Sequence, residues 1–325
     1  MNLNVEPIVA ALRAARQDSA STRTATMTFA VFHDDERIAG WVEERTRALA
    51  DKHPSRVVIF DGRQDPGDQR IASGEVRGEW VEVGARGASA AELATALTML
   101  ELPSAPVILL WAGGSIAHDD RALALARLAT ATICSSSLQR TDGEGLRDLC
   151  NFVEQHPEIV VHDIAYLRLA PWQEVVAEFF DDPAHAEKLA QIRTVDVGAG
   201  SDAEMYYVLG WLASRLAWTP QSRGTFGSPG GAVTFSMERG GPPRRLSRIE
   251  LRTKDERYTA FVHPQDEAAI CLETEVRGKT DRRCAPMHSV DLASLVERAI
   301  LQRHRDDVFI ESMTMARHIL DREAA

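Results

Sequence analysis

The chain has 325 residues, of which 44% are hydrophobic and 26% are charged, a composition typical of folded globular proteins rather than disordered chains. The formal net charge of -11 opposes binding of the whole molecule to nucleic acids or anionic membranes. No apolar run approaches the ~18 residues that span a bilayer, and the first residues lack a signal-peptide pattern. We therefore expect a cytoplasmic protein whose four cysteines are reduced.

The first two thirds of the chain alternate between two kinds of apolar spacing. A period of two predicts strands and a period of 3.6 predicts helices, so the alternation indicates an α/β domain. Residues 57–60 and 107–111 are apolar on both faces, as expected in a mixed, largely parallel sheet covered by helices. The predicted strands are residues 24–33, 56–60, 75–83, 106–112, 130–136 and 164–170, and the predicted helices are residues 36–51, 89–100, 119–129, 143–155 and 172–181.

Residues 161–182 predict a strand followed by a helix. Pro171 fits the first turn of a helix, where its missing N–H group costs no hydrogen bond. Trp172 then falls on the apolar face of that helix, opposite the acidic residues. We expect this helix to pack against the rest of the protein.

Residues 201–218 predict a helix with two apolar stripes. One stripe is aliphatic, and the opposite stripe contains Tyr207, Trp211 and Trp218. Only one stripe can pack on a sheet, so the other must contact either more of this chain or a partner.

Residues 219–231 are rich in glycine, proline and serine, and predict a linker or long loop. Beyond them, short strands joined by polar turns predict an antiparallel sheet, and helices follow near residues 291–303 and 307–322. The sequence thus predicts an α/β domain over residues 1–218 and a C-terminal α+β domain, with an antiparallel sheet and terminal helices, over residues 232–325.

A glycine-containing turn is the strongest candidate for a nucleotide site. Gly198, Gly200 and Ala203 match the G-x-G-x-x-G/A pattern, which can bring backbone N–H groups close to a pyrophosphate. The acidic residue that should follow about 20 residues later at the end of a strand is missing. We therefore favour a simple turn before a capped helix. A nucleotide- or sugar-phosphate-binding α/β enzyme or sensor that uses this turn is the alternative function.

Other catalytic motifs are incomplete. Residues 278–280 (Gly-Lys-Thr) end like a phosphate-binding loop, but Glu273 occupies the position of its leading glycine. Ser115 lies in a turn similar to a nucleophile elbow, but Ala117 replaces the final glycine. The ten histidines show no metal-binding spacing. The sequence therefore predicts no catalytic residue, no cofactor and no metal.

A polar segment at residues 53–56 joins a predicted helix to a buried strand. Pro54 can end the helix, and Ser55 or Arg56 can satisfy its last carbonyl groups. The same segment, which begins with His53, could instead line a partner or ligand site at the strand edge. The structural role is favoured and the second stays open.

Two basic clusters contrast with the acidic composition. We favour a role in protecting exposed strand edges, and an acidic protein partner is the alternative. The second cluster has no interleaved aromatic residues, which argues against single-stranded nucleic acid as a ligand. The clusters contain Arg239, Arg244, Arg245, Arg248, Arg252, Lys254 and Arg257, followed by Arg277, Lys279, Arg282 and Arg283.

Cys271 and Cys284 are the candidates for a redox pair. They face each other if Arg277 and Gly278 are the two central residues of a tight hairpin, where the glycine can adopt a positive φ. Opposed residues in such a hairpin are close enough for a disulfide, although most such pairs stay reduced in the cytoplasm.

Five segments in order carry a resemblance to a known family. They are "HPSRVVIF" at 53–60, "LPSAPVILLWAGG" at 102–114, "ICSSS" at 133–137, "HDIAYLRLAPWQEVVAEFFD" at 162–181 and "YYVLGWLASRLAW" at 206–218. Together they resemble the OpcA family, the glucose-6-phosphate dehydrogenase assembly proteins of cyanobacteria and actinobacteria. The likeness extends from about residue 25 into the second domain.

The resemblance implies a protein without enzymatic activity. Such a protein would bind glucose-6-phosphate dehydrogenase, favour its active oligomer or its response to substrate, and support NADPH production in the oxidative pentose phosphate pathway. Cyanobacterial members are linked to thioredoxin through cysteines, so thioredoxin is a second expected partner, whereas nucleic acids and membranes are not. Aromatic and arginine side chains often anchor protein contacts, although these aromatics could equally be buried between the two domains. The candidate interface residues are His53, Arg56, Trp111, Trp172, Tyr207, Trp211, Trp218, Arg245 and Arg248.

Overall fold

The computed structural model describes residues 3–18, 25–72, 79–139, 143–242, 245–287 and 291–324. The chain divides into two compact units, and each unit is made of three segments. The first unit contains Met1–Ser135, Asn151–Asp163 and Leu292–Arg305, and the second contains Ser136–Cys150, Ile164–Asp291 and Asp306–Ala325. Within the described residues, no helix combines the length and the apolar character that crossing a membrane requires.

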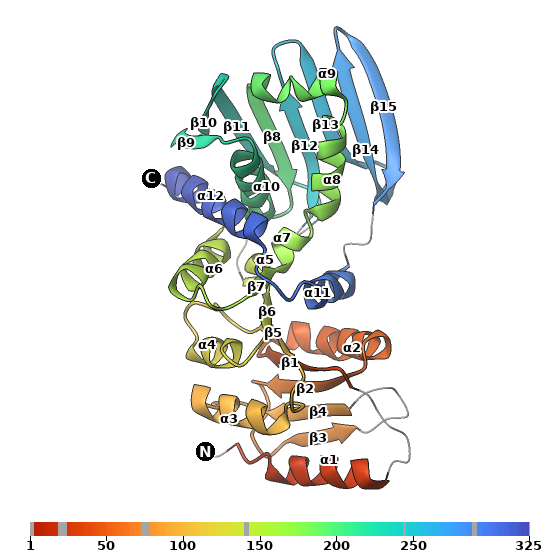
Figure 1. The fold of residues 1–325 in the computed structure, drawn as a ribbon, viewed down its shortest axis with the longest axis vertical. Coiled ribbons are helices and arrows are strands. Elements are labelled where there is room, and N and C mark those ends of the chain that lie inside the picture. Colours follow the sequence, from red (N-terminus) through yellow and green to blue (C-terminus); the bar gives the residue numbers. More distant parts are fainter. Residues whose placement is uncertain are drawn as a thin grey trace. The chain divides into compact units, whose positions relative to one another are not determined.

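The first unit is built on a seven-stranded sheet, here called sheet A (Figure 1). Its strand order is β3-β4-β2-β1-β5-β6-β7, and all neighbours are parallel except β3, which runs antiparallel to β4. The six parallel strands follow the doubly wound order of dinucleotide-binding folds. This confirms the predicted α/β class. The strands are β1 (Met27–His33), β2 (Ser55–Asp61), β3 (Gln69–Ala72), β4 (Glu79–Gly84), β5 (Val107–Ala112), β6 (Ala131–Cys134) and β7 (Val161–Asp163).

Helices cover both faces of sheet A. Strands β1, β2 and β5 are buried at every residue, as the continuous apolar runs of β2 and β5 predicted for those two strands. Helix α2 (Glu36–Lys52) packs on β1, β2 and α11 (Leu292–Leu301). Helix α3 (Ala90–Leu100) contacts both α1 (Glu6–Asp18) and α4 (Asp120–Ala126).

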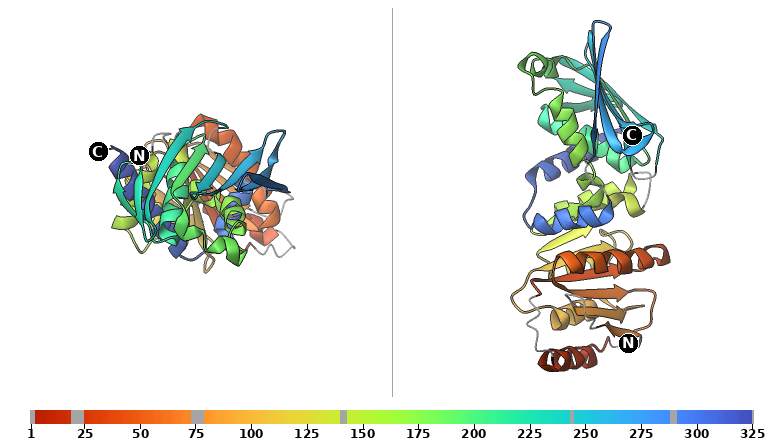
Figure 2. Two further views of the ribbon diagram at one scale, coloured as in Figure 1. Left: turned by 90° about the horizontal axis from the view of Figure 1, so that it is seen from above. Right: turned by 90° about the vertical axis from the view of Figure 1, so that its right-hand side faces the viewer.

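The second unit is built on an eight-stranded sheet, here called sheet B. Its order is β15-β14-β13-β12-β8-β11-β10-β9, and only the β8–β11 pair is parallel. Figures 1 and 2 show α8 (Ala170–Glu178), α10 (Asp202–Arg215) and α12 (Asp307–Ala324) on one face. The strands are β8 (Thr194–Ala199), β9 (Thr219–Ser222), β10 (Thr225–Ser228), β11 (Gly231–Arg239), β12 (Leu246–Arg252), β13 (Glu256–His263), β14 (Asp266–Val276) and β15 (Lys279–Pro286).

Helix α10 is buried on nearly all sides because α12 covers the surface that sheet B leaves open. At their crossing, a Cβ on Gly210 would lie 2.2 Å from the carbonyl oxygen of Ser312. The absence of a side chain at Gly210 therefore permits the close approach of the two helices. Two residues of the predicted aromatic stripe contact this chain itself, because Tyr207 lies 6.1 Å from Phe309 of α12 and Trp218 lies 5.7 Å from Phe226 of β10, measured between ring centroids.

Three predictions of the chain's organisation were wrong. Residues 164–170, predicted as a strand, begin helix α7, and the strand is the preceding β7. Residues 219–231 are not a linker, because β9 and β10 extend sheet B there. The domain boundary at residue 218 was misplaced, since β8 and α10 belong to the second unit. The remaining helices are α6 (Glu144–Gln155) and the short helices α5 (Ser136–Gln139), α7 (Ile164–Leu167), α9 (Pro183–Ala186) and the 3-10 helix Leu189–Gln191.

Candidate functional site

The carboxyl edge of sheet A is the position where a fold of this class would bind a ligand. In doubly wound sheets, ligands bind outside the carboxyl ends of the strands where the strand order reverses, which here is between β1 and β5. A dinucleotide site needs glycines in the turn after β1, so that backbone can approach a pyrophosphate. This chain instead has Asp34, Asp35 and Glu36 between β1 and the first turn of α2. These carboxylates repel phosphate at the position where a dinucleotide would need N–H donors.

Neighbouring arginines hold these carboxylates in place. Asp35 accepts hydrogen bonds from the backbone N–H of Arg37, at 2.9 Å, and from its guanidinium. The Arg37 hydrogen bonds lower the pKa of Asp35 to about 2, so this carboxylate is ionised at neutral pH. Arg121 pairs with Asp119 at 2.6 Å and lies 3.8 Å from Asp34.

Aromatic side chains fill the space above β1 and β5. Phe32 and Trp111 stack with ring centroids 4.5 Å apart and planes at 8°. The guanidinium of Arg121 lies 4.7 Å from the centroid of the Phe32 ring. A Cβ on Gly113 would lie 2.8 Å from Phe32, so this glycine is needed for the packing. The crevice of the fold is thus occupied by the protein's own side chains.

The ends of β1 and β2 carry a buried polar pair. His33 and Asp61 are both almost fully buried, and Nδ1 of His33 lies 3.9 Å from Asp61. Burial lowers the pKa of His33 and outweighs the opposing charge of Asp61. Burial alone would raise the pKa of Asp61, but hydrogen bonds donated by Arg63 hold it below its usual value. Both side chains serve the packing of this edge.

The glycine turn at 198–200 does not form a nucleotide site in this arrangement. Gly198 lies inside β8, between β11 and β12, and a Cβ there would lie 2.9 Å from the hydroxyl of Ser247. The first turn of α10 carries Asp202 and Glu204, and Arg239 donates a 2.6 Å hydrogen bond to Asp202. Carboxylates again occupy the helix end that a phosphate would need.

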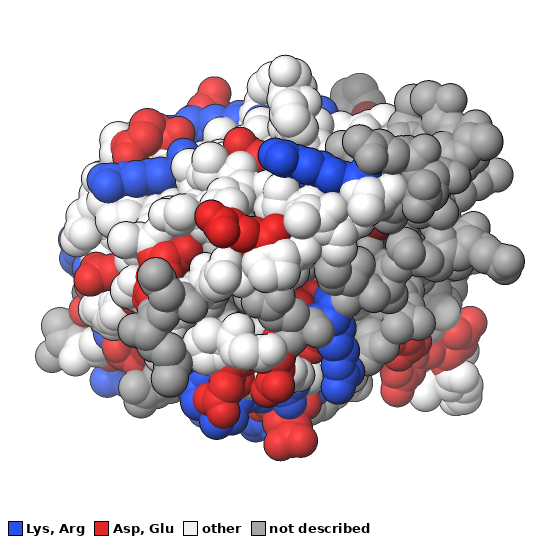
Figure 3. Space-filling view, turned by 90° about the horizontal axis from the view of Figure 1, so that it is seen from below, with Lys and Arg blue, Asp and Glu red and all other residues white. Residues whose placement is uncertain are grey.

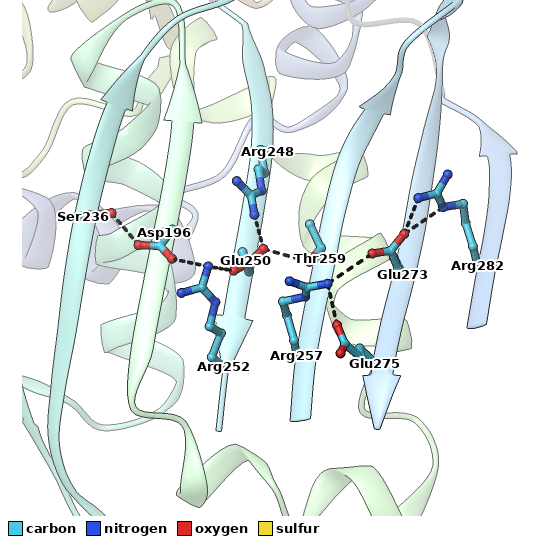
Figure 4. A network of polar contacts seen from close by, with 10 residues as sticks. All are labelled: Asp196, Ser236, Arg248, Glu250, Arg252, Arg257, Thr259, Glu273, Glu275 and Arg282. Carbon is cyan, nitrogen blue, oxygen red and sulfur yellow. Dashed lines mark hydrogen bonds and ion pairs between the residues drawn. The ribbon is translucent and has the colours of Figure 1, made fainter. Parts of the chain in front are cut away.

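The face of sheet B opposite the helices carries a network of ion pairs (Figure 4). Glu250 is at its centre, with only 1% of its side chain exposed. It is paired with Arg248 and Arg252 and accepts a hydrogen bond from the Thr259 hydroxyl at 3.1 Å. Further along the face, Arg257 pairs with Glu275 at 2.5 Å, and the remaining members are Asp196, Ser236, Glu273 and Arg282.

Several arginines of the two basic clusters form ion pairs with carboxylates of this network. Burial alone would raise the pKa of Glu250, but the hydrogen bond and charge of Arg248 and the charge of Arg252 hold it below its usual value. Arg248 and Arg252 therefore face an ionised carboxylate on their own strand, and sequence analysis missed this acid. The alternation Arg248-x-Glu250-x-Arg252 was the signal, because alternate residues of a strand share one face. Arg244 lies outside the described residues.

Acidic and basic side chains are also interspersed on a second described surface. Figure 3 views the molecule from the end where Figure 1 places α1, and acidic and basic side chains are interspersed over the part of this surface that is described. Neither sign forms a continuous patch there, so this described surface offers no extended basic track for a polyanion.

Most of the predicted interface residues lie inside the protein. Arg56 is buried, pairs with Glu79 at 2.6 Å and donates to the carbonyl oxygen of Leu100 at 2.5 Å. It therefore satisfies the last carbonyl groups of a helix, as the structural alternative predicted, but the helix is α3 rather than α2. The aromatic side chains that are likewise buried, and so absent from the surface of this structure, are Trp111, Trp172, Tyr207 and Trp218.

Four predicted interface residues remain accessible. His53 is partly exposed and lies 3.1 Å from Glu297, Trp211 is half-buried, and Arg245 and Arg248 are exposed. Their role at an interface stays a prediction.

The predicted hairpin of the cysteine pair is present. Arg277 and Gly278 have positive φ at the tip between β14 and β15, and Cys271 pairs directly with Cys284 in the register. The two sulfurs form a disulfide. The remaining two cysteines, Cys134 and Cys150, are buried and free of disulfides.

Comparison with solved structures concerns the fold alone. The 3-ketoreductase KijD10 from Actinomadura kijaniata, solved with TDP-benzene and NADP, aligns over 92% of this chain and 97% of its own, with 14% identity and a TM-score of 0.57. The Bacillus subtilis protein yvaA, described as an oxidoreductase, aligns over 92% and 97% of the two chains, with 10% identity and a TM-score of 0.51. The chain therefore shares the fold of these two proteins, and at these identities nothing more follows.

Sequence comparison identifies the relatives. A protein of Synechocystis sp. described as OxPP cycle protein OpcA is 35% identical over 128 residues, which are 39% of this chain and 26% of the relative. The OpcA protein of Synechococcus elongatus is 29% identical over 171 residues, which are 51% of this chain and 34% of the relative. The match thus spans about a quarter to a third of the length of these relatives. Residues 46–151 match the family model for the glucose-6-phosphate dehydrogenase subunit N-terminal domain, and residues 159–313 match that for its C-terminal domain. The chain belongs to the OpcA family.

Proposed function

We propose that this chain is a non-catalytic assembly factor that binds glucose-6-phosphate dehydrogenase and favours its active oligomer. It would thereby support NADPH production in the oxidative pentose phosphate pathway. The proposed partner and pathway rest on membership of the OpcA family. The observation that carries the non-catalytic role is the turn after β1, where Asp34, Asp35 and Glu36 stand in place of a phosphate-binding glycine turn.

An activator of this kind needs only a difference in affinity between two states of its partner. A bias of about 1–3 kcal/mol changes an apparent affinity by roughly 5- to 150-fold. No group that makes or breaks bonds is needed for that effect.

The accessible predicted residues are our proposed contact points. Trp211 offers a half-buried aromatic ring, and Arg248 offers an exposed guanidinium on the open face of sheet B. Both residue types are enriched among the side chains that dominate binding energy at interfaces. Thioredoxin is a second proposed partner, and the exposed Cys284 of the disulfide would be its point of attack.

The test mixes the purified chain with the dehydrogenase of the same organism. We expect a larger dehydrogenase assembly by mass photometry, or a lower substrate concentration at half saturation, and we expect Trp211→Ala to weaken the effect. Arg86→Ala is the control, because Arg86 is an exposed side chain of the first unit. The absence of any change in assembly or saturation, under both oxidising and reducing conditions, contradicts the proposal.

Calorimetry separates this proposal from the nucleotide-binding alternative. We expect no heat when NADP or ATP is titrated into the isolated chain. Saturable binding of either nucleotide would instead favour the alternative.

A further inference from the structure

A cavity of about 200 Å³ lies at one end of sheet B, within the second unit. It is smaller than the clefts of about 300–1,000 Å³ that hold drug-sized ligands, so only a small molecule fits. Most of its wall is apolar, and Trp172, only 3% exposed, belongs to that wall. The other apolar residues of the wall are Pro242, Leu246, Val262, Pro264 and Met287.

Two irregularities of neighbouring strands meet at this cavity. The pairing of β12 with β8 shifts register between Leu246 and Arg248, and the pairing of β13 with β14 shifts between Val262 and His263. Ser247, at the first shift, and His263, at the second, both line the cavity. Such bulges are over-represented next to binding sites, because they redirect side chains out of the regular ladder.

The glycine of the rejected nucleotide motif takes part in this arrangement. A Cβ on Gly198 would lie 2.9 Å from the Ser247 hydroxyl oxygen, closer than real Cβ contacts. The glycine at this position therefore leaves room for the hydroxyl. Gly198 thus makes room for Ser247 in the cavity wall, a role different from contact with a pyrophosphate.

Hydrogen-bond donors line the inner part of the cavity. Arg168 is 13% exposed, and its Nη1 donates to Ser137 at 3.2 Å and to Glu204 at 3.1 Å. The guanidinium also carries N–H groups on Nε and Nη2, which can donate to a ligand. His263 accepts a hydrogen bond at Nδ1 from the backbone N–H of Gln265, at 3.2 Å, which assigns the proton of the neutral ring to Nε2.

Each of the two arginines at the cavity has one carboxylate partner. Arg168 pairs with Glu204, which does not line the cavity, and Arg245 pairs with Glu267, the one carboxylate among the described lining residues. Glu267 is 72% exposed, and it lies 3.3 Å from Arg245. The carboxylate is therefore solvated, and Arg245 can turn from it towards a ligand.

We propose that this cavity binds a small organic anion, a carboxylate or a phosphate monoester, with a ring-sized body. The ring contacts the apolar wall that includes Trp172, and the acid group accepts hydrogen bonds from Arg168, Ser247 and Arg245. Carboxylates and phosphates share this chemistry, so the experiment compares them directly.

The test uses the whole chain alone, so its result is independent of the dehydrogenase experiment. Benzoate, phenyl phosphate and glucose 6-phosphate are titrated separately while thermal unfolding and tryptophan fluorescence are recorded, and benzyl alcohol is the uncharged control. We expect at least one anion to raise Tm in a saturable way and benzyl alcohol to leave it unchanged. The anion that binds best identifies the acid group, and the response to glucose 6-phosphate shows whether a sugar ring is accepted.

Two matched variants locate the binding. Arg245→Gln removes a charge-assisted hydrogen bond and should weaken the anion about tenfold. Arg282→Gln, on β15 and outside the cavity lining, should bind it as the original chain does. Trp172→Phe should remove the fluorescence response. A failure of all three anions to bind, equal stabilisation by benzyl alcohol, or equal weakening in the two arginine variants would overturn the proposal.

Discussion

The two sheets of this protein differ in where their charged side chains lie and in how far these side chains are exposed. In sheet A, strands β1, β2 and β5 are buried at every residue, and polar groups such as Arg56 and Asp61 lie at the strand ends. In sheet B, charged side chains run across one face, and β15 is exposed at every residue. Arg56 in sheet A therefore depends on one buried carboxylate, whereas Glu250 in sheet B has two partly exposed arginine partners.

This difference predicts how each sheet tolerates the loss of a carboxylate. Breaking a buried pair leaves the other charge in a region of low polarity, which is costly, whereas breaking an exposed pair leaves a solvated charge, which is not. The predictions below test that contrast.

The largest effect is expected for Glu79→Ala in sheet A. It removes the carboxylate 2.6 Å from Arg56, whose side chain is 6% exposed, and should lower the free energy of unfolding by about 3–5 kcal/mol. Urea unfolding measures this loss. The double variant Arg56→Met, Glu79→Leu should recover part of it, since no buried charge remains but the Leu100 carbonyl oxygen loses its donor. A loss under 1 kcal/mol in the single variant would remove the contrast between the sheets.

A smaller effect is expected for Glu250→Gln at the centre of the sheet B network. The carboxylate is buried, but its partners Arg248 and Arg252 are 45% and 46% exposed and remain hydrated. We expect a loss of about 1.5–3 kcal/mol, the range for hydrogen bonds to charged groups. Glu275→Gln, in which the affected carboxylate is 36% exposed, is the matched control with a loss of about 0–1 kcal/mol. Equal losses in the two variants would show that burial does not set the cost.

The stability of the first unit should depend on the protonation of His33. Burial lowers the pKa of His33 below its ordinary value of 6.5, so the folded chain keeps the ring neutral. Below pH 6.5 the unfolded chain binds a proton that the folded chain does not bind, so stability falls as the pH decreases. Urea unfolding at pH 7.5 and pH 5.5 should show a smaller pH-dependent loss in His33→Gln than in the original chain. An unchanged difference between the two pH values would rule out His33 as its source.

The smallest effect is expected for Arg282→Ala on the exposed strand β15. Arg282 is 58% exposed and pairs with Glu273, so we expect a loss of at most about 1 kcal/mol. Measurement in 1 M NaCl should reduce this loss further, because salt screens exposed charges. A loss that grows with salt would point to packing of its side chain on Phe261 instead.

The local elements could largely be predicted from the sequence. The buried runs of β2 and β5 were found because they are apolar on both faces, and the register of β14 with β15 was found because a two-residue turn at Arg277 and Gly278 fixes it. The strand predicted at residues 164–170 was wrong because a short apolar run fits a strand and a buried helix equally well. The linker predicted at residues 219–231 was wrong because proline is also tolerated in an edge strand, and Pro220 lies in β9 at the edge of sheet B.

The candidate sites were harder to predict. Arg56 is a polar residue in a strand, and nothing local shows that Glu79 and the end of α3 fold over it. The cavity lined by Trp172 lies at two register shifts, one between the distant strands β12 and β8 and one between the consecutive strands β13 and β14, and neither shift has a local signature in the sequence. Both sites therefore depend on contacts that a single segment of sequence does not reveal.

The path of the chain also limits how the protein can be taken apart. The polypeptide crosses from one unit to the other near residues 135, 150, 163, 291 and 305. Helix α11 belongs to the first unit and supplies the fully buried Ala299, although it is translated after every strand of sheet B. A ribosome-bound chain therefore cannot complete its first unit until most of the second has emerged. Fragments cut at a single position will each lack part of their own interior, so separate expression of the two halves should yield unstable pieces.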